Sequence, residues 1–413
     1  MRRIAATSRT SSSSVFPVLF VTVFLDFLGF AMVLPYLYFY ASSLGASPVV
    51  YGLLLTSYSV AQFAFTPVWG ALSDRLGRRK IMLVCLVGSG AAFVLFGIAS
   101  NIVLLFLARI AAGAMGATVP VAMAYASDIT TAQNRMAQMG RLGAAFGMGL
   151  ILGPAVGGTL SSAFGYAVPA FLAAALAFSN LALGYFKMPE SRGARTKDSF
   201  LQSFRQIAKS PGIKLLLAAY FITMLGFYVM EGTSTPWLQK VFDYGPFQVG
   251  LLFLYIGGVV SAVQGVAVPK LSRMYAPQTL FVAGVASLAA GLALLGFAQD
   301  LATLIVSSTF VPLGMGLTTA SITTLISLRT AADKQGATLG IGQSVAGISQ
   351  IIGPSFGAAV FSQGIAVGAI GLPFMVAAAM TVPAVMMGIW FATRQARIAP
   401  RQEEEGEGND HVL

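Results

Sequence analysis

Long apolar segments alternate with short polar connections along almost the whole chain. A helix needs about 20 predominantly apolar residues to cross a bilayer. Twelve segments satisfy this requirement, and we expect them to be transmembrane helices: 15–40, 49–70, 80–99, 102–126, 138–162, 166–187, 214–238, 248–269, 278–297, 301–326, 336–362 and 367–392. The hydropathy pattern therefore predicts an all-α membrane protein.

The second half of the chain repeats the first. The segment Gly140–Gly158 (GRLGAAFGMGLILGPAVGG) matches Gly340–Ala358 (GIGQSVAGISQIIGPSFGA) at an offset of 200 residues without a gap. Weaker matches extend on both sides of this segment. Self-similarity at a fixed period indicates a duplicated structural unit. We therefore expect two pseudo-symmetric bundles of six helices each.

The polar segments give the expected boundaries of these bundles. We expect a cytoplasmic segment at 1–14 and bundles at 15–187 and 214–393. The linker at 188–213 has apolar residues at helical spacing among basic ones, which predicts a short amphipathic helix on the inner surface. The acidic tail at 394–413 is expected to be cytoplasmic and disordered.

Composition agrees with a membrane protein. Hydrophobic residues make up 56% of the chain and charged residues 9%, against about 25% charged residues in a typical soluble domain. The net charge is +11, but all except two of the 25 Lys and Arg residues fall on one side of the predicted topology. Cytoplasmic loops carry such an excess. The charge thus predicts that both termini are cytoplasmic, and it favours contact with anionic lipid over nucleic acid.

The sequence lacks the residues of several enzyme classes. Cys85 is the single cysteine, and His411, in the tail, is the single histidine. Neither a Ser-His-Asp or Cys-His catalytic set nor a Cys/His metal cluster can therefore form within the fold. No G-x-x-x-x-G-K-[ST] loop is present to bind ATP phosphates. We expect no enzymatic activity, metal or cofactor, and any uphill work must draw on a gradient.

Three ionisable residues interrupt the predicted spans: Asp26 in the first, Arg109 in the fourth and Glu231 in the seventh. Such residues are costly in a membrane and are functional by default. Asp26, near the midplane, is a candidate proton or substrate site; the alternative is a structural acid bonded to neighbouring helices. Arg109 either pairs with an acid, Asp26 first and Glu231 second, or extends toward the surface. Glu231 binds a cationic substrate or a proton, or simply lies near the outer surface.

Further polar residues mark a candidate cavity. The run 232–236 (GTSTP) follows Glu231 and predicts a broken or flexible helix beside a water-filled space. Tyr228, Gln264 and Gln343 are candidates for lining that space. For Gln343, helix packing is the alternative role.

The connection between the second and third spans, 69–80 (WGALSDRLGRRK), resembles the G-x-L-x-D-R-x-G-R-R/K signature of the major facilitator superfamily. The resemblance implies a cytoplasmic gate whose ion cluster rearranges when the helices separate; a loop that only orients the protein is the alternative. The corresponding segment 269–277 has Arg273 where Asp74 stands, so the first copy is implied to be the gate. The implied gate residues are Gly70, Asp74, Arg75, Gly77, Arg78, Arg79, Asp128 and Arg135. For Asp128 and Arg135, the alternative is an acid at a helix end and a loop cation without a role in gating.

Two further motifs are similar to those of this superfamily. The R-x-x-x-G spacing of Arg109 and Gly113 resembles a fourth-helix motif whose arginine is associated with proton coupling. The G-x-x-x-G-P-x-x-G-G run in the fifth span resembles a motif that marks antiporters, and 126–158 resembles the twelve-span tetracycline-efflux group. The eighth span lacks the histidine that some members of that group carry there. The antiporter-motif residues are Gly149, Gly153, Pro154, Gly157 and Gly158.

The resemblance implies the major facilitator fold and a secondary active transporter. We expect a proton-coupled antiporter that exports drugs or other small amphipathic molecules by alternating access. It is expected to be a monomer in the plasma (inner) membrane, with an organelle membrane as the alternative. Other functions that remain open are a uniporter or symporter for an endogenous metabolite and, more remotely, a non-transporting receptor or sensor, or a membrane enzyme.

Overall fold

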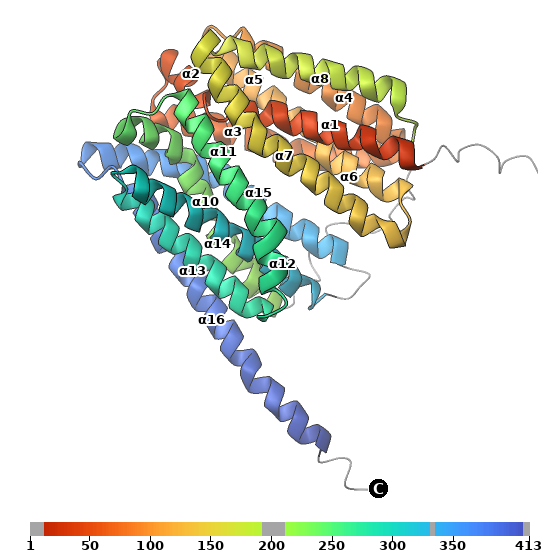
Figure 1. Cartoon of the computed structure of the whole chain (residues 1–413), viewed down its shortest axis with the longest axis vertical. Coiled ribbons are helices and arrows are strands. Elements are labelled where there is room, and N and C mark those ends of the chain that lie inside the picture. Colours follow the sequence, from red (N-terminus) through yellow and green to blue (C-terminus); the bar gives the residue numbers. More distant parts are fainter. Residues whose placement is uncertain (1–11, 192–210, 331–334, 408–413) are drawn as a thin grey trace, which may run out of the picture. The chain divides into compact units, whose positions relative to one another are not determined.

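The computed structural model describes residues 12–191, 211–330 and 335–407, and these residues form helices without any β-strand (Figure 1). The first half contains α1 (Ser12–Val33), α2 (Leu37–Ser43), α3 (Pro48–Leu76), α4 (Arg78–Gly97), α5 (Ile102–Met115), α6 (Thr118–Ile129), α7 (Ala132–Phe164) and α8 (Ala167–Lys187). The second half contains α10 (Pro211–Phe242), α11 (Pro246–Ala262), a π-helix (Val263–Ala267), α12 (Val268–Leu271), α13 (Pro277–Phe297), α14 (Leu301–Ser327), α15 (Gln335–Ala366) and α16 (Leu372–Glu407).

Within the described residues, 12 helical segments are long and apolar enough to cross a membrane, and each overlaps a predicted span. Two of the spans are interrupted. The first ends at Val33, and α2 begins at Leu37, after Pro35, whose ring lacks the backbone N–H that a continuous helix needs. The fourth divides at residues 116–117, between α5 and α6. The predicted number of spans is therefore confirmed for the part of the chain that the structure describes.

The break predicted in the seventh span is wrong. Helix α10 runs without interruption through 232–236. The Thr233 hydroxyl donates to the Val229 carbonyl at 3.0 Å, and the Ser234 hydroxyl donates to the Met230 carbonyl at 2.8 Å. These side chains bond to the preceding turn of the same helix, so they are compatible with helical backbone.

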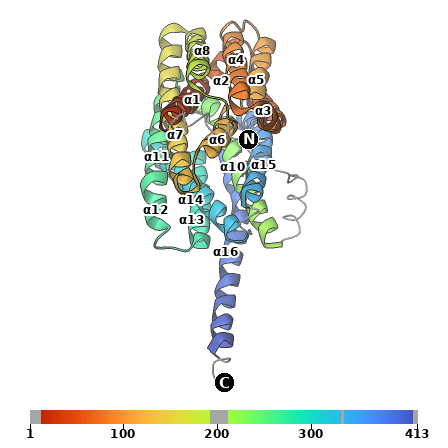
Figure 2. The same cartoon turned by 90° about the vertical axis from the view of Figure 1, so that its right-hand side faces the viewer.

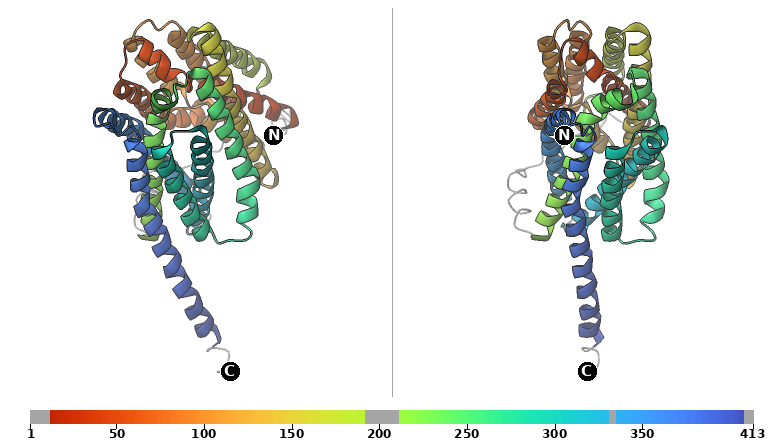
Figure 3. Two further views of the ribbon diagram at one scale, coloured as in Figure 1. Left: turned by 60° about the vertical axis from the view of Figure 1, so that its left-hand side comes forward. Right: turned by 90° about the vertical axis from the view of Figure 1, so that its left-hand side faces the viewer.

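The C-terminal segment also differs from its prediction. Helix α16 continues to Glu407 and extends past the other helices of its unit (Figure 3), whereas disorder was expected from residue 394. Ala, Arg, Gln and Glu dominate this segment, and all four are strong helix formers. The amphipathic helix expected in the linker falls at 192–210, which lies outside the described residues.

The helices form two compact units. One contains Met1–Lys197 with Leu238–Gly257, and the other contains Asp198–Trp237 with Gly258–Leu413. In the first unit α1 packs along α7, and α4 packs against both α5 and α8 (Figure 2). In the second, α13 packs along α14 and α16. The first part of α11 thus belongs to the first unit, although the sequence repeat assigns all of α11 to the second half.

Each unit has its own apolar core. In the first unit, side chains from α1, α4 and α6 are fully buried together, among them Leu19, Met82 and Ala122. In the second, Phe281 and Val285 of α13 pack with buried residues of α10, α14 and α16. The polar residues described below therefore occupy defined positions on packed helices.

Candidate functional site

Arg78 is the centre of an ion cluster that joins the ends of α3, α4 and α6. Its Nη2 lies 2.6 Å from Oδ1 of Asp74, and its Nε lies 3.1 Å from Oδ2 of Asp128. Its Nη1 donates to the Ser73 hydroxyl at 2.6 Å. Arg78 is only 9% exposed, and a buried guanidinium needs paired carboxylates and satisfied donors of this kind. Three of the predicted gate residues are thus in direct contact.

Gly77 allows a carboxylate from the segment that follows α8 to reach the start of α4. Its φ is 108°, a conformation that favours glycine, and a Cβ at this position would overlap the Glu190 carboxylate. Glu190 Oε1 accepts a hydrogen bond from the Arg79 amide at 3.1 Å. No side chain at the preceding residue caps α4, so Glu190 satisfies one of its free N–H groups. Glu190 is not among the residues predicted from the sequence, because it is 111 positions from the amide that it binds.

The residue after Glu190 extends this contact. The Ser191 carbonyl accepts from the Arg78 amide at 3.1 Å, and the Ser191 hydroxyl donates to Asp128 Oδ2 at 3.1 Å. The Arg79 guanidinium donates to the Tyr185 carbonyl and lies 5.5 Å from the centroid of the Tyr185 ring. The end of α8 is therefore held to the same cluster as α3, α4 and α6.

The other predicted gate residues lie at the edge of this cluster. Arg135 is exposed and donates to the Ser127 carbonyl at 3.3 Å, one residue before Asp128. Arg75 is exposed in the last turn of α3. A Cβ at Gly70 would meet no atom within 4 Å, so packing within the described structure does not explain the glycine there.

A second polar site lies inside the first unit, where α1, α3, α5 and α6 meet. Arg109 is 4% exposed, and its guanidinium carbon lies 4.4 Å from the centroid of the Tyr58 ring. The Tyr58 hydroxyl is within electrostatic range of both Arg109 and Asp26. The Asp26 carboxyl lies beside the Thr118 hydroxyl at the start of α6. The structure thus gathers Asp26 and Arg109 around one tyrosine, and Arg109 does not extend to the surface.

Gly113 accounts for the R-x-x-x-G spacing after Arg109. A Cβ at Gly113 would overlap the Tyr58 carbonyl oxygen, so a larger residue would separate α5 from α3. Gln62, one turn after Tyr58, donates from Nε2 to the Tyr58 hydroxyl at 3.3 Å and to the Gly116 carbonyl at 3.2 Å. Tyr58 and Gln62 are not among the residues predicted from the sequence, because aromatic and amide side chains in an apolar span are also typical of ordinary helix packing.

Three glycines of the predicted antiporter motif face α1, the first at the level of Asp26 and the other two further along, as far as Met32. A Cβ at the first would lie 2.8 Å from the Leu28 amide nitrogen and 2.9 Å from the Phe24 carbonyl oxygen. Close helix approach through small residues is common in membranes. The spacing of these glycines therefore sets how closely the helix that carries Asp26 can pack. They are Gly149, Gly153 and Gly157.

The remaining motif residues face α11. A Cβ at Gly158 would overlap the Pro246 carbonyl oxygen and lie 3.0 Å from the Gly250 Cα. A Cβ at Gly250 would in turn lie 2.5 Å from the carbonyl oxygen of Pro154. The motif thus has two packing faces on one helix, one toward α1 and one toward α11.

The second half repeats the α1–α7 contact with one polar change. Gly353 and Gly357 of α15 face Tyr228 and Val229 of α10, where a Cβ would overlap atoms of α10. Ser349 occupies the place of Gly149, and its hydroxyl donates to the Phe221 carbonyl at 3.1 Å. In the first half, the close approach of the α1 backbone leaves no room for a side chain at position 149. In the second half, the Ser349 side chain fits at the corresponding position and bonds to the α10 backbone.

The other predicted site residues belong to the second half of the chain and lie on different helices. Glu231 is half-buried on α10, within electrostatic range of the Tyr228 hydroxyl one turn earlier. Gln264 is exposed and belongs to the π-helix Val263–Ala267. Gln343 is exposed on α15. The structure brings Tyr228 and Glu231 together, and among the described residues neither glutamine side chain forms a hydrogen bond or an ion pair.

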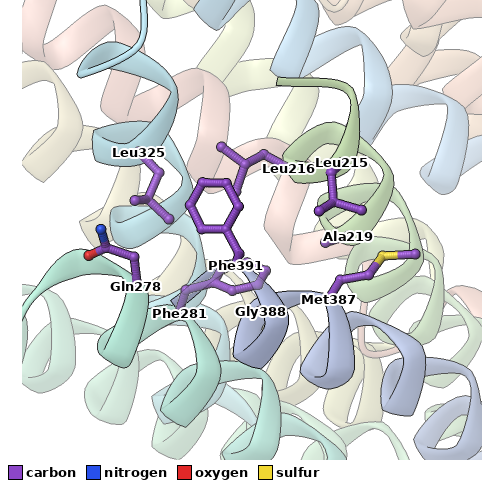
Figure 4. A pocket seen from close by; sticks show the side chains of 9 residues that line it. All are labelled: Leu215, Leu216, Ala219, Gln278, Phe281, Leu325, Met387, Gly388 and Phe391. Atoms are coloured by element: carbon purple, nitrogen blue, oxygen red, sulfur yellow. The ribbon is translucent and has the colours of Figure 1, made fainter. Parts of the chain in front are cut away.

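A small cavity lies among the first turns of α10 and α13, the end of α14 and the middle of α16 (Figure 4). Its volume is about 10 Å³, whereas pockets for drug-sized ligands span about 300–1,000 Å³. The cavity has an almost entirely apolar lining and is too small for a substrate. It is lined by Leu215, Leu216, Ala219, Gln278, Phe281, Leu325, Met387, Gly388 and Phe391.

Comparison with known proteins supports one family. The sequence model of the Major Facilitator Superfamily matches residues 19–354. The chain is 29% identical to the tetracycline resistance protein, class C, of Escherichia coli, over 92% of this chain and 98% of that protein. It is 24% identical to multidrug resistance protein 2 of Bacillus subtilis, over 87% and 91%. The crystal structure of a human organic anion transporter is 20% identical with a TM-score of 0.68, covering 92% of this chain and 99% of that one.

Proposed function

The chain belongs to the Major Facilitator Superfamily, and we propose that it is a proton-coupled antiporter that exports drugs or other small amphipathic molecules by alternating access. It is a multi-pass membrane transporter of small molecules rather than an enzyme. Its similarity to a tetracycline resistance protein and a multidrug resistance protein supports drugs as the substrate class. The 12 apolar helices and their internal repeat fit two bundles that open alternately to each side.

The observation that carries proton coupling is the polar site around Tyr58. Asp26 and Arg109 lie inside the first and fourth spans and share this tyrosine as a neighbour. Charged residues inside a membrane are costly and mark ion or substrate pathways. A carboxylate that can take up a proton, with a permanent cation near the same tyrosine, gives the site two charge states that act differently on that cation.

The proposed cycle follows from those two states. A proton from the outer side neutralises Asp26, removes its attraction to Arg109 and favours substrate release. Loss of the proton on the inner side restores the negative charge and favours binding of the next substrate. A gradient drives transport because the two conformations differ in proton affinity.

The Arg78 cluster is proposed to act as the cytoplasmic gate. It ties four helix ends together through the contacts of Arg78, Asp128 and Glu190. Helices that separate at this end must break or shift those contacts. The excess of basic residues on the same side supports cytoplasmic termini and a plasma (inner) membrane location. We further propose that one chain suffices for transport.

Transport in proteoliposomes tests the proposal. Purified protein would be reconstituted, and a panel of substrates, including tetracycline and a fluorescent amphipathic cation such as ethidium, would be measured with and without an imposed pH gradient. We expect at least one compound to move faster when protons flow down their gradient in the direction opposite to the movement of that compound. Equal rates in both conditions for every transported compound would indicate a uniporter and contradict antiport.

A further inference from the structure

Tyr58 occupies the centre of the polar site, between the helices that carry its two charged residues. On one side its ring supports the Arg109 guanidinium at 4.4 Å. On the other side its ring centroid lies 5.2 Å from that of Phe30, which stands one turn after Asp26 on α1. The tyrosine is 7% exposed. A cation over the face of a buried aromatic ring is attracted by the ring quadrupole, and the attraction is strongest where water is excluded.

The Tyr58 hydroxyl is held in a fixed direction. Gln62 donates to it and also to the Gly116 carbonyl, at the junction of α5 and α6. Thr118, two residues further on, lies beside the Asp26 carboxyl. The hydroxyl is thus anchored to the same helix junction that borders the acid.

The position of Tyr58 against α5 depends on Gly113. A side chain there would overlap the Tyr58 carbonyl oxygen, so the glycine one turn after Arg109 lets the α3 backbone approach α5. The same approach places the Tyr58 ring against the Arg109 guanidinium. Gly113 therefore permits the contact between Tyr58 and Arg109.

We propose that Tyr58 is the positioning residue of the coupling site: its ring holds Arg109, and its hydroxyl, oriented by Gln62, carries the charge state of Asp26 to that arginine. This inference rests on the proposed proton antiport. It assigns the ring and the hydroxyl separate roles. The ring sets where the Arg109 guanidinium lies. The hydroxyl sets how strongly the electrostatic potential at that guanidinium depends on the protonation of Asp26.

The test separates these roles with Tyr58→Leu, Tyr58→Phe and a matched control. Tyr51 lies two turns earlier on the same helix, about 10 Å away, is 3% exposed and packs against the Tyr38 ring at 5.3 Å. Tyr51→Leu therefore removes a similar buried ring away from Arg109. Each variant would be reconstituted, and substrate transport would be measured with a pH gradient and, as exchange, across a series of equal internal and external pH values.

Tyr58→Leu is expected to slow gradient-driven transport on the order of 30-fold, the factor that corresponds to a desolvated cation–π contact. Tyr58→Phe keeps the ring, so its rate should stay within about threefold of the parent, a limit set by one modest hydrogen bond. Its pH profile of exchange should nevertheless be displaced, because the hydroxyl is gone. Tyr51→Leu should keep the pH profile of the parent.

Two results would overturn the inference. One is an unchanged pH profile in Tyr58→Phe, which differs from the parent by one oxygen and tests the hydroxyl even if Tyr58→Leu does not assemble. The other is equal loss of rate in Tyr58→Leu and Tyr51→Leu. If the parent protein itself shows no response to the gradient, the proposed function fails as well, and that outcome is visible before any variant is compared.

Discussion

Gly149→Ala tests whether the glycines of α7 set the position of the helix that carries Asp26. An added Cβ would lie 2.8 Å from the Leu28 nitrogen and 2.9 Å from the Phe24 oxygen, whereas ordinary contact begins at 3.4 Å. Both atoms belong to the α1 backbone and cannot rotate away. Helices α1 and α7 must therefore separate by roughly 0.6 Å, and overpacking of this kind costs about 1–3 kcal/mol.

Gly147→Ala is the matched control. It lies on the same helix, and a Cβ there would meet no atom within 4 Å. Without a clash, alanine keeps its advantage in helix propensity over glycine, about 1 kcal/mol at most. The control should therefore unfold at the same temperature as the parent or higher.

The single cysteine supplies the assay. Cys85 is fully buried in the core of the first unit, the unit that contains both α1 and α7. A thiol-reactive fluorophore would label it only as this unit opens on heating. At about 2–4 °C per kcal/mol for a unit of this size, Gly149→Ala should unfold about 2–12 °C below Gly147→Ala, which shares its gain in helix propensity. Equal unfolding temperatures for Gly149→Ala and Gly147→Ala would refute the proposed role of this packing.

Three further predictions use the same labelling assay or its equivalent for the second unit. Glu190→Ala leaves the start of α4 without its cap and should destabilise the first unit by about 1 kcal/mol, whereas Glu190→Gln, which keeps an acceptor oxygen, should have a smaller effect; equal effects would contradict capping. Ser349→Gly removes the hydrogen bond to the Phe221 carbonyl and should cost about 1 kcal/mol; in a Trp69→Phe background, the fluorescence of Trp237 and Trp390 during heating reports this loss in the second unit, and no loss would show that the hydroxyl is dispensable. Hydrogen bonds from the Thr303 amide and hydroxyl hold the pKa of the Asp300 carboxyl below its ordinary value; the resulting stability is present above an ordinary aspartate pKa near 4 and is lost as pH falls through the lowered pKa. Unfolding temperatures measured between about pH 5 and pH 3 should therefore fall more steeply in the parent than in Asp300→Asn, and parallel curves would contradict this.

The sequence predicts the spans well because each must bury its own backbone polar groups in a long apolar helix. It also predicts the contact of Asp74, Arg78 and Asp128, because opposite charges at neighbouring helix ends have few other partners. The sequence could not reveal Glu190, since a cap supplied by a segment distant in the sequence has no local pattern. Tyr58 was missed for a related reason: only its position against Arg109 distinguishes it from other buried aromatic residues.

Two predictions differ from the structure: the helix break at 232–236 and the place of α11 in the second bundle. The run 232–236 has the composition of a helix break, but its hydroxyls bond to carbonyls one turn earlier, and Gly232 serves contact with Pro354. The assignment of residues 246–257 to the first unit follows from glycine contacts between α11 and α7. Such contacts depend on which surfaces of the two helices face each other, and the sequence of one helix does not show this.

Proton movement driven by substrate tests the central claim most directly. Proteoliposomes containing a pH-sensitive dye would be given a transported substrate in the absence of any imposed gradient, and the internal pH would be followed for the parent and for Asp26→Asn. The account predicts that substrate addition moves protons in the opposite direction in the parent and that this signal disappears in Asp26→Asn. Proton movement of equal size in both proteins would contradict it.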